Sequence, residues 1–155
     1  NAPEQSSVMS KQFIEGRFAR LMEVIMKYLC LIYSNEHTLH SHPDSPRDDE
    51  CLAYAQSVQA SGRMLAAEPL ESVETATTVR MRNGKVLITD GPFAETKEQL
   101  AGFYLIEARD LNEALQVSAH IPAARVGCVE VRPVRALNLQ YDAQSTPAFA
   151  AGGQS

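Results

Sequence analysis

The sequence predicts a mixed α+β domain with a ferredoxin-like βαββαβ core and an inserted β-hairpin. Three observations support this fold class. Apolar runs of strand length alternate with two helical patterns, an Asn-Gly dipeptide joins two β-rich runs near the middle of the chain, and the elements follow the order β, α, β, β, β, β, α, β. Setting the central hairpin aside as an excursion leaves the ferredoxin-like plan.

Three parts are expected along the 155 residues. Residues 1–25 form an N-terminal extension with an amphipathic helix, because its apolar residues fall on one helical face: Ile14, Phe18, Leu21, Met22 and Ile25. Residues 26–137 form the folded domain. Residues 138–155 are rich in Ala, Gly, Gln and Ser and are expected to be a disordered tail.

The domain is expected to begin with a buried strand over 27–33 and a polar loop over 34–44. A helix should follow, with Ser45 as its N-cap, Pro46 as its first residue and the acidic residues 48–50 in its first turn. This order of residue types suits a helix N-terminus, where the peptide dipoles favour negative charge.

The first helix should bury an apolar face and end at a glycine. Gly62 is placed for a left-handed C-cap, and residues 64–69 can form a brief strand. The residues expected on the buried face are Cys51, Leu52, Ala55 and Val58.

A hairpin is predicted over residues 77–82 and 85–89, because Asn83-Gly84 is the preferred two-residue hairpin loop. The loop sets the register, in which Val79 faces Ile88 and Thr77 faces Asp90. The apolar face, expected in the core, carries Val79, Met81, Val86 and Ile88. The other face, expected in solvent, carries Thr78, Arg80, Arg82, Lys85 and Thr89.

After the hairpin, residues 95–100 are expected to make one helical turn and residues 102–108 a strand. Asp110 should cap the second helix, with Glu113 as its capping-box partner, and Pro122 should stop it. The face expected to be buried carries Ala114, Leu115, Val117 and Ile121.

The last strand is expected over residues 126–134. Two helices cover one face of such a sheet, whereas Val, Leu and Phe alternate onto both faces. Face-to-face dimerisation would cover the other face, giving a dimeric α/β barrel of eight or more strands.

Composition limits the partners of this chain. Its formal net charge is −5 and its basic residues are scattered, so neither a nucleic acid nor a membrane surface is expected as a partner. The three cysteines, without regular spacing, are interpreted as small buried residues in a reducing compartment, the cytoplasm. No Gly-rich phosphate loop or Walker pattern is present, and no cofactor is expected.

Asp90 is the candidate catalytic residue. At a strand end on a core-directed face, desolvation could raise the pKa of its carboxyl group, as a general acid or base requires. Alternatively, the Asp90 carboxylate accepts backbone N–H groups within the Asp-Gly-Pro turn. Both interpretations remain open on sequence alone.

Other side chains could line a pocket near Asp90, or they could have structural roles. Glu68, Glu95 and Lys97 are either pocket groups or a solvated turn. The aromatic residues Tyr33, Phe93, Phe103 and Tyr104 form either a pocket wall or core. His120 either joins the pocket or caps a helix C-terminus. His37, His40 and His42 either bind zinc or copper or belong to a solvated loop; the loop is favoured because their spacing matches no closed structural site, and no metal is expected.

Five segments resemble the YCII-related proteins and, within them, the branch named for its DGPF tetrapeptide. The resemblance covers residues 26 to about 137. It is carried by Met26-Lys27-Tyr28-Leu29, Glu74-Thr75-Ala76-Thr77-Thr78-Val79-Arg80, Asp90-Gly91-Pro92-Phe93-Ala94-Glu95-Thr96-Lys97-Glu98, Gly102-Phe103-Tyr104 and Val129-Glu130-Val131-Arg132-Pro133.

The resemblance implies a dimeric barrel of ferredoxin-like subunits in the bacterial cytoplasm. A few relatives resemble enzymes such as dehydrochlorinases, and the fold is similar to that of muconolactone isomerase. Those enzymes use a histidine near a carboxylate, but the first helix here carries no histidine. Other members of the branch are encoded beside, or fused to, extracytoplasmic-function sigma factors.

Two functions follow as hypotheses. One is a small-molecule enzyme with proton-transfer or lyase-type chemistry, in which Asp90 is the acid or base. Its hairpin register argues against a role for Arg80, and Glu130 and Arg132 fit a surface pair. The other is a non-catalytic dimeric module that binds a protein such as a sigma factor. A ligand-binding dimer without chemistry is a third alternative.

Overall fold

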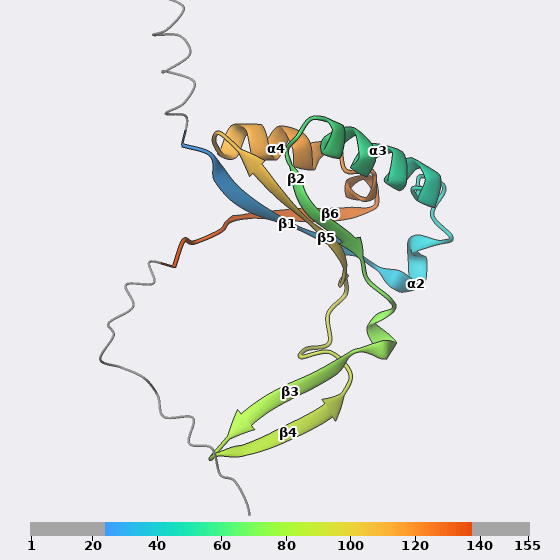
Figure 1. Cartoon of the computed structure of the whole chain (residues 1–155). Coiled ribbons are helices and arrows are strands. Elements are labelled where there is room, and N and C mark those ends of the chain that lie inside the picture. Colours follow the sequence, from blue (N-terminus) through green and yellow to red (C-terminus); the bar gives the residue numbers. More distant parts are fainter. Residues whose placement is uncertain (1–23, 138–155) are drawn as a thin grey trace, which may run out of the picture.

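A computed structural model describes residues 24–137, and Figure 1 shows a mixed α+β fold. Four antiparallel strands form the main sheet in the order β2-β5-β1-β6. This arrangement is consistent with a ferredoxin-like unit and confirms the α+β class. The strands are β1 (Met26–Ser34), β2 (Met64–Pro69), β5 (Gln99–Ala108) and β6 (Gly127–Pro133). The helix expected within residues 1–25 and the tail 138–155 lie outside the described residues.

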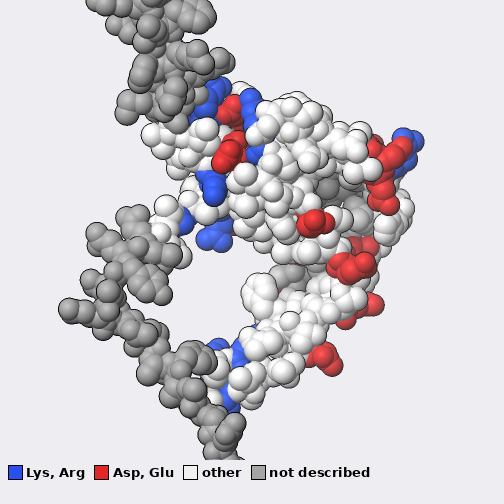
Figure 2. Space-filling model, viewed as in Figure 1, with Lys and Arg blue, Asp and Glu red and all other residues white. Residues whose placement is uncertain are grey.

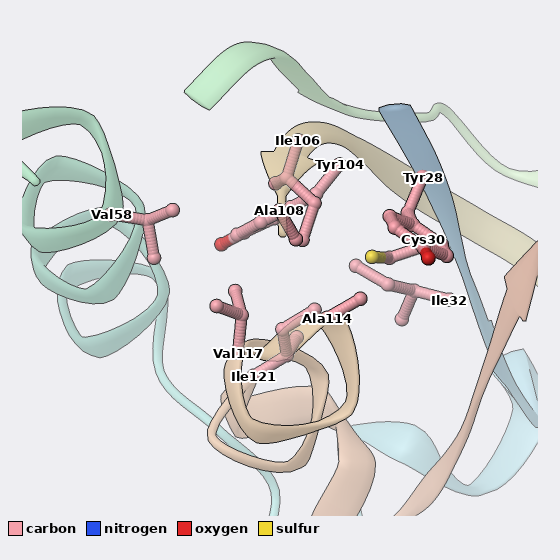
Figure 3. Packing of buried hydrophobic residues seen from close by; sticks show 10 residues of the cluster. All are labelled: Tyr28, Cys30, Ile32, Val58, Tyr104, Ile106, Ala108, Ala114, Val117 and Ile121. Carbon is pink, nitrogen blue, oxygen red and sulfur yellow. The ribbon is translucent and has the colours of Figure 1, made fainter. Parts of the chain in front are cut away.

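Helices α3 (Asp48–Ala60) and α4 (Leu111–Ala119) both cover the same face of this sheet (Figure 1). Figure 3 shows the core between the two layers. The sheet supplies Tyr28, Cys30, Ile32, Tyr104, Ile106 and Ala108, and the helical layer supplies Val58, Ala114, Val117 and Ile121.

The start of α3 differs from the prediction. Arg47 is the N-cap and makes no side-chain cap, whereas Ser45 lies outside the helix. The Arg47 guanidinium instead binds Asp49 through two 2.9 Å hydrogen bonds. The expected left-handed glycine is present, since Gly62 has φ +75° just after the helix. Leu52, expected to be buried, is 59% exposed, and only Val58 of this helix is fully buried.

The Asp110 cap of α4 is confirmed, but the capping box differs from the prediction, because Glu113 binds the N–H of the residue before the N-cap. Asp110 Oδ1 accepts a 2.8 Å hydrogen bond from the Glu113 N–H, and the Glu113 carboxylate accepts one of 2.7 Å from the Arg109 N–H. Leu115 was expected to be buried but is exposed, and Ser118 is buried in its place. The helix ends before Pro122, which begins a 3₁₀ helix, η2 (Pro122–Arg125), that the pattern did not predict.

A short helix, α2 (Glu36–Leu39), occupies the segment predicted to be a loop. Its N-cap is Asn35, whose Oδ1 accepts a 3.0 Å hydrogen bond from the His37 N–H. Asparagine is a preferred N-cap, so the local signal was present but the helix is only one turn long.

The predicted hairpin is present as a separate two-stranded sheet of β3 (Thr77–Arg82) and β4 (Lys85–Asp90). Every predicted pair, from Thr77 opposite Asp90 to Arg82 opposite Lys85, is confirmed. Asn83 and Gly84 have φ of 51° and 73°, as the favoured hairpin turn requires. A 3₁₀ turn, η1 (Val73–Thr75), precedes the hairpin. The helical turn expected over 95–100 is absent, because Gln99 and Leu100 begin β5 and pair with β1.

The apolar face of the hairpin is exposed and not in the core as predicted, whereas on the other face Arg82, Lys85 and Thr89 are exposed as predicted. Val79, Met81, Val86 and Ile88, expected in the core, are between 57% and 69% exposed. Thr78 and Arg80, expected in solvent, are half-buried. The hairpin extends away from the sheet, on the side opposite the helices (Figure 1), so the core formed by residues 24–137 does not cover its apolar face.

Candidate functional site

Within residues 24–137, one face of the sheet carries no helix (Figure 1), and it is called here the open face. Along β1 and β5, the residues that alternate with the core point to this face and are only half-buried: Leu29, Leu31, Tyr33, Phe103 and Leu105. A row of side chains crosses it, because Glu68 pairs with Phe103, Phe103 with Leu31, and Leu31 with Glu130. The open face is therefore an apolar strip with carboxylates at both edges.

Polar groups gather at one end of the open face. Cys128 pairs with Tyr33, and its thiol donates a hydrogen bond of 3.5 Å to Glu98 Oε2. Desolvation, followed by the hydrogen bond to Glu98, raises the pKa of the Cys128 thiol. The thiol is therefore a proton donor at neutral pH and not a thiolate nucleophile. The expectation that every cysteine is buried is wrong for Cys128, which is exposed, while Cys30 is buried and Cys51 half-buried.

The Asp-Gly-Pro-Phe turn after β4 is held by the half-buried side of the hairpin. The Gly91 N–H donates to the Ala76 carbonyl at 2.7 Å, and Thr78 Oγ1 donates to the Gly91 carbonyl at 2.8 Å. Arg80 Nη2 donates to the Phe93 carbonyl at 3.2 Å. Arg80, placed in solvent by the sequence pattern, therefore holds this turn. Gly91 has φ +108°, a backbone conformation that only glycine adopts without strain.

Asp90 lies at the end of β4 and is exposed. It shares a hairpin face with Val79 and Ile88, since it pairs with Thr77. Within residues 24–137 its carboxylate accepts no hydrogen bond, so the turn-capping alternative is not observed there. The described part of the chain leaves this residue exposed, and a catalytic role for it stays a prediction.

The other predicted pocket residues separate into two groups. Phe93, 79% exposed, and the exposed Glu95 and Lys97 lie in the connection between β4 and β5. Glu68 and Tyr33 lie on the open face. These five residues form the first group, which lies on the side of the sheet without helices.

Tyr104 and His120 lie on the helix side of the sheet. Tyr104 is 7% exposed and stacks on Tyr54 with ring centroids 6.3 Å apart, and burial raises its pKa to about 12. His120 is the C-cap of α4, with Nδ1 at 2.7 Å from the Gln116 carbonyl oxygen. The sheet therefore lies between these two residues and the open face.

An open groove of about 300 Å³ runs between α3 and α4. Its polar end holds Arg63, whose guanidinium lies 2.7 Å from the buried Glu113 carboxylate. The groove is lined by Tyr54, Ser57, Val58, Ser61, Arg63, Gln116, Val117 and His120. The sequence pattern gave no sign of it, because its residues come from two helices and a strand start.

The histidine segment around α2 forms no metal centre in the described structure. Between residues 24 and 137, no three His, Cys, Asp or Glu side chains are grouped so that they could hold a metal ion. His42 Nδ1 instead accepts a 3.2 Å hydrogen bond from the Asp44 N–H. Within the same range, no helix has the length and apolarity that crossing a membrane requires.

An antiparallel four-stranded sheet, two helices on one face and a protruding hairpin define the chain as an α+β protein of ferredoxin-like plan. A family model, the YCII-related domain, matches residues 26–138, and the chain belongs to that family. It is also similar to an uncharacterised protein, R00369, of Rhizobium meliloti (strain 1021). The two are 36% identical over 115 residues, which cover 70% of this chain and 92% of that protein.

Proposed function

We propose that the chain is a homodimeric protein of the DGPF branch that binds a small organic molecule on the open face of its sheet. The observation that supports this most is the composition of that face. It is an apolar strip with a few polar groups at one end, Tyr33, Cys128 and Glu98, which is the usual make-up of a small-molecule site. A second subunit over this strip would exclude water from a bound molecule.

The reaction proposed for this site is proton transfer or lyase-type chemistry, with Asp90 as acid or base. Asp90 shares the apolar face of the hairpin, so any partner that covers this face would also desolvate its carboxylate. Cys128 and Tyr33 would supply neutral hydrogen-bond donors to an anionic or phenolic ligand. Three free thiols support a reducing location, the bacterial cytoplasm.

The experiment is a ligand screen by thermal shift with small carboxylic acids and phenols, followed by calorimetry and product analysis on each hit. Asp90→Asn should abolish turnover of a hit while the melting temperature changes by less than about 2 °C. Glu74→Gln is the matched control, since Glu74 is also exposed, precedes the hairpin and is not among the candidate pocket residues. Turnover that survives Asp90→Asn would remove the acid–base role, and a screen without hits would remove the ligand site.

A non-catalytic module is the second candidate function. It is supported by the environment of Asp90, which is exposed and has no hydrogen-bond partner among the described residues. In this alternative the dimer binds a protein such as an extracytoplasmic-function sigma factor. The apolar face of the helix expected within residues 1–25 would be its contact surface. Binding in a purified two-component assay should then tolerate Asp90→Asn and be lost when Phe18, Leu21 and Ile25 of that face are replaced by serine. The opposite pattern would exclude this function.

A further inference from the structure

We propose that the hairpin docks its apolar face onto the open face of a second copy, while the second copy's hairpin does the same in return. The arm is defined here as residues 71–98, which comprise η1, β3, β4 and the connection to β5. This inference rests on the homodimer of the proposed function and names the segments that form it.

The arm carries apolar side chains that the described residues, 24–137, leave uncovered. Val79, Met81, Val86 and Ile88 lie together on one face and are 64%, 60%, 57% and 69% exposed. A two-stranded hairpin cannot bury such a face by itself and is marginally stable alone. A contiguous exposed apolar surface of this kind is typical of an interface.

The base of the arm is fixed so that the arm points away from the open face of its own chain (Figure 1). Glu36 in α2 accepts hydrogen bonds from the Val73 N–H at 2.9 Å and from Ser72 Oγ at 2.8 Å. The Leu70 N–H donates to the Ala101 carbonyl at 2.8 Å, which ties the start of the same segment to β5. Both surfaces therefore remain available to another molecule.

Charge identifies that molecule as a second copy. The arm tip carries Arg82 and Lys85, neither of which has an ion pair within residues 24–137, and Figure 2 shows basic groups at this end. The β2 edge of the open face carries Glu68, which is also without an ion pair there. Arg132, the cation at the opposite edge, already pairs with Glu130 at 3.6 Å. One chain thus offers both a cationic apolar arm and an apolar strip with an acidic edge.

A reciprocal contact of this kind closes with two-fold symmetry, which is the commonest arrangement of homodimers. It also has a consequence for the site. The arm would carry Asp90 of the second copy over the apolar strip that holds Leu31 and Tyr33. The binding site would then be composite, and Asp90 would be exposed in one chain but covered in the dimer.

The first test compares two adjacent residues of β4 that lie on opposite faces of the hairpin. Ile88→Thr changes the apolar face and Leu87→Thr, the matched control, changes the other; the wild-type side chains are 69% and 49% exposed. Analytical ultracentrifugation of the full chain should give a dimer. The dissociation constant should rise at least tenfold for Ile88→Thr and less than twofold for Leu87→Thr. Circular dichroism of each variant checks that the fold is retained.

Each outcome has a distinct meaning. A monomeric wild type would overturn both the arm contact and the proposed homodimer. A wild-type dimer that neither variant weakens would overturn the arm contact alone and leave the proposed function standing. Equal weakening by both variants would also overturn it, because the two faces of the arm would then not differ.

A second measurement identifies what the arm touches without relying on a substitution. A mixture of ¹⁵N-labelled and unlabelled chains is treated with a carbodiimide, which joins amines to carboxylates in direct contact. Links from Lys85 to Glu68 should join labelled to unlabelled chains and disappear in Lys85→Arg, which keeps the charge. Links found only within single chains would overturn the proposal, because the arm would then cover its own sheet.

Discussion

Gly127 is the position where one added methyl group should be most damaging. It is the first residue of β6 and pairs with Ser34 at the end of β1. A Cβ atom built there would lie 1.9 Å from the Tyr33 carbonyl oxygen and 3.0 Å from the Tyr33 carbonyl carbon. Both atoms belong to the backbone, so no side-chain rotation can relieve the contact.

The size of the effect follows from this geometry. Real Cβ contacts are essentially never closer than 3.0 Å, so the start of β6 must move by at least 3.0 − 1.9 = 1.1 Å. Such a shift loses a hydrogen bond at the end of the ladder, about 1 kcal/mol, and strains the packing by about 1–3 kcal/mol. Gly127→Ala should therefore lower the free energy of unfolding by about 2–4 kcal/mol.

Urea unfolding and thermal melts measure this loss. The control is Gly62→Ala, because a Cβ there meets nothing within 4 Å and the cost, about 1 kcal/mol, comes only from the left-handed backbone. Hydrogen exchange should also rise at the β1–β6 pairs around Ser34 in Gly127→Ala and stay unchanged there in Gly62→Ala. Equal losses of stability in the two variants would refute the reasoning.

Three further predictions concern charge and hydrogen bonding. The pKa of Glu113 is lowered first by the hydrogen bond from the Arg109 N–H and then by the guanidinium groups of Arg109 and Arg63. The contribution of the Glu113 carboxylate to stability is therefore present above its ordinary pKa and is lost as pH falls through the lowered value. Glu113→Gln should cost about 1–2 kcal/mol at pH 7 and less as pH falls below the ordinary pKa of a glutamate, as measured by melts over that range. Burial raises the pKa of Tyr104 to about 12, so stability should fall as pH rises from about 10 to 12, and Tyr104→Phe should reduce that fall in alkaline unfolding curves. Arg80→Gln removes the hydrogen bond to the Phe93 carbonyl, so hydrogen exchange of residues 91–98 should increase. The free energy of unfolding should change by less than about 1 kcal/mol. Unchanged exchange would contradict the role of Arg80 in holding the turn.

Elements set by local chemistry could be predicted from the sequence. Asn83-Gly84 determines the hairpin register because its turn geometry is local, and all predicted pairs are present. Asp110 and Glu113 fixed the start of α4 for the same reason. The helical turn predicted at Gln99 and Leu100 was wrong. These residues pair with β1, which is distant in sequence, and this pairing outweighs local propensity.

The candidate site was less predictable because it depends on contacts between distant segments. The period of two in the hairpin showed which side is apolar, but it could not show whether the same chain covers that side. The hydrogen bond between Cys128 and Glu98, which are 30 residues apart in sequence, forms only because the folded sheet brings the two residues together. Tyr104 and His120 looked like pocket residues because the pattern did not show which face of the sheet each one occupies.

The position of the arm in the chain has a consequence for how this fold can change. Pro69 of β2 lies opposite Gly102 of β5, so the whole excursion leaves and re-enters the sheet at neighbouring points. Closing residues 71–98 instead of a four-residue turn costs only about 2 kcal/mol of chain entropy. Insertions or deletions within residues 71–98 leave every strand pair of the main sheet in place, because Gln99 and Leu100, which pair with β1, lie outside this range. This junction is therefore where the domain can gain or lose a whole structural module at little thermodynamic cost.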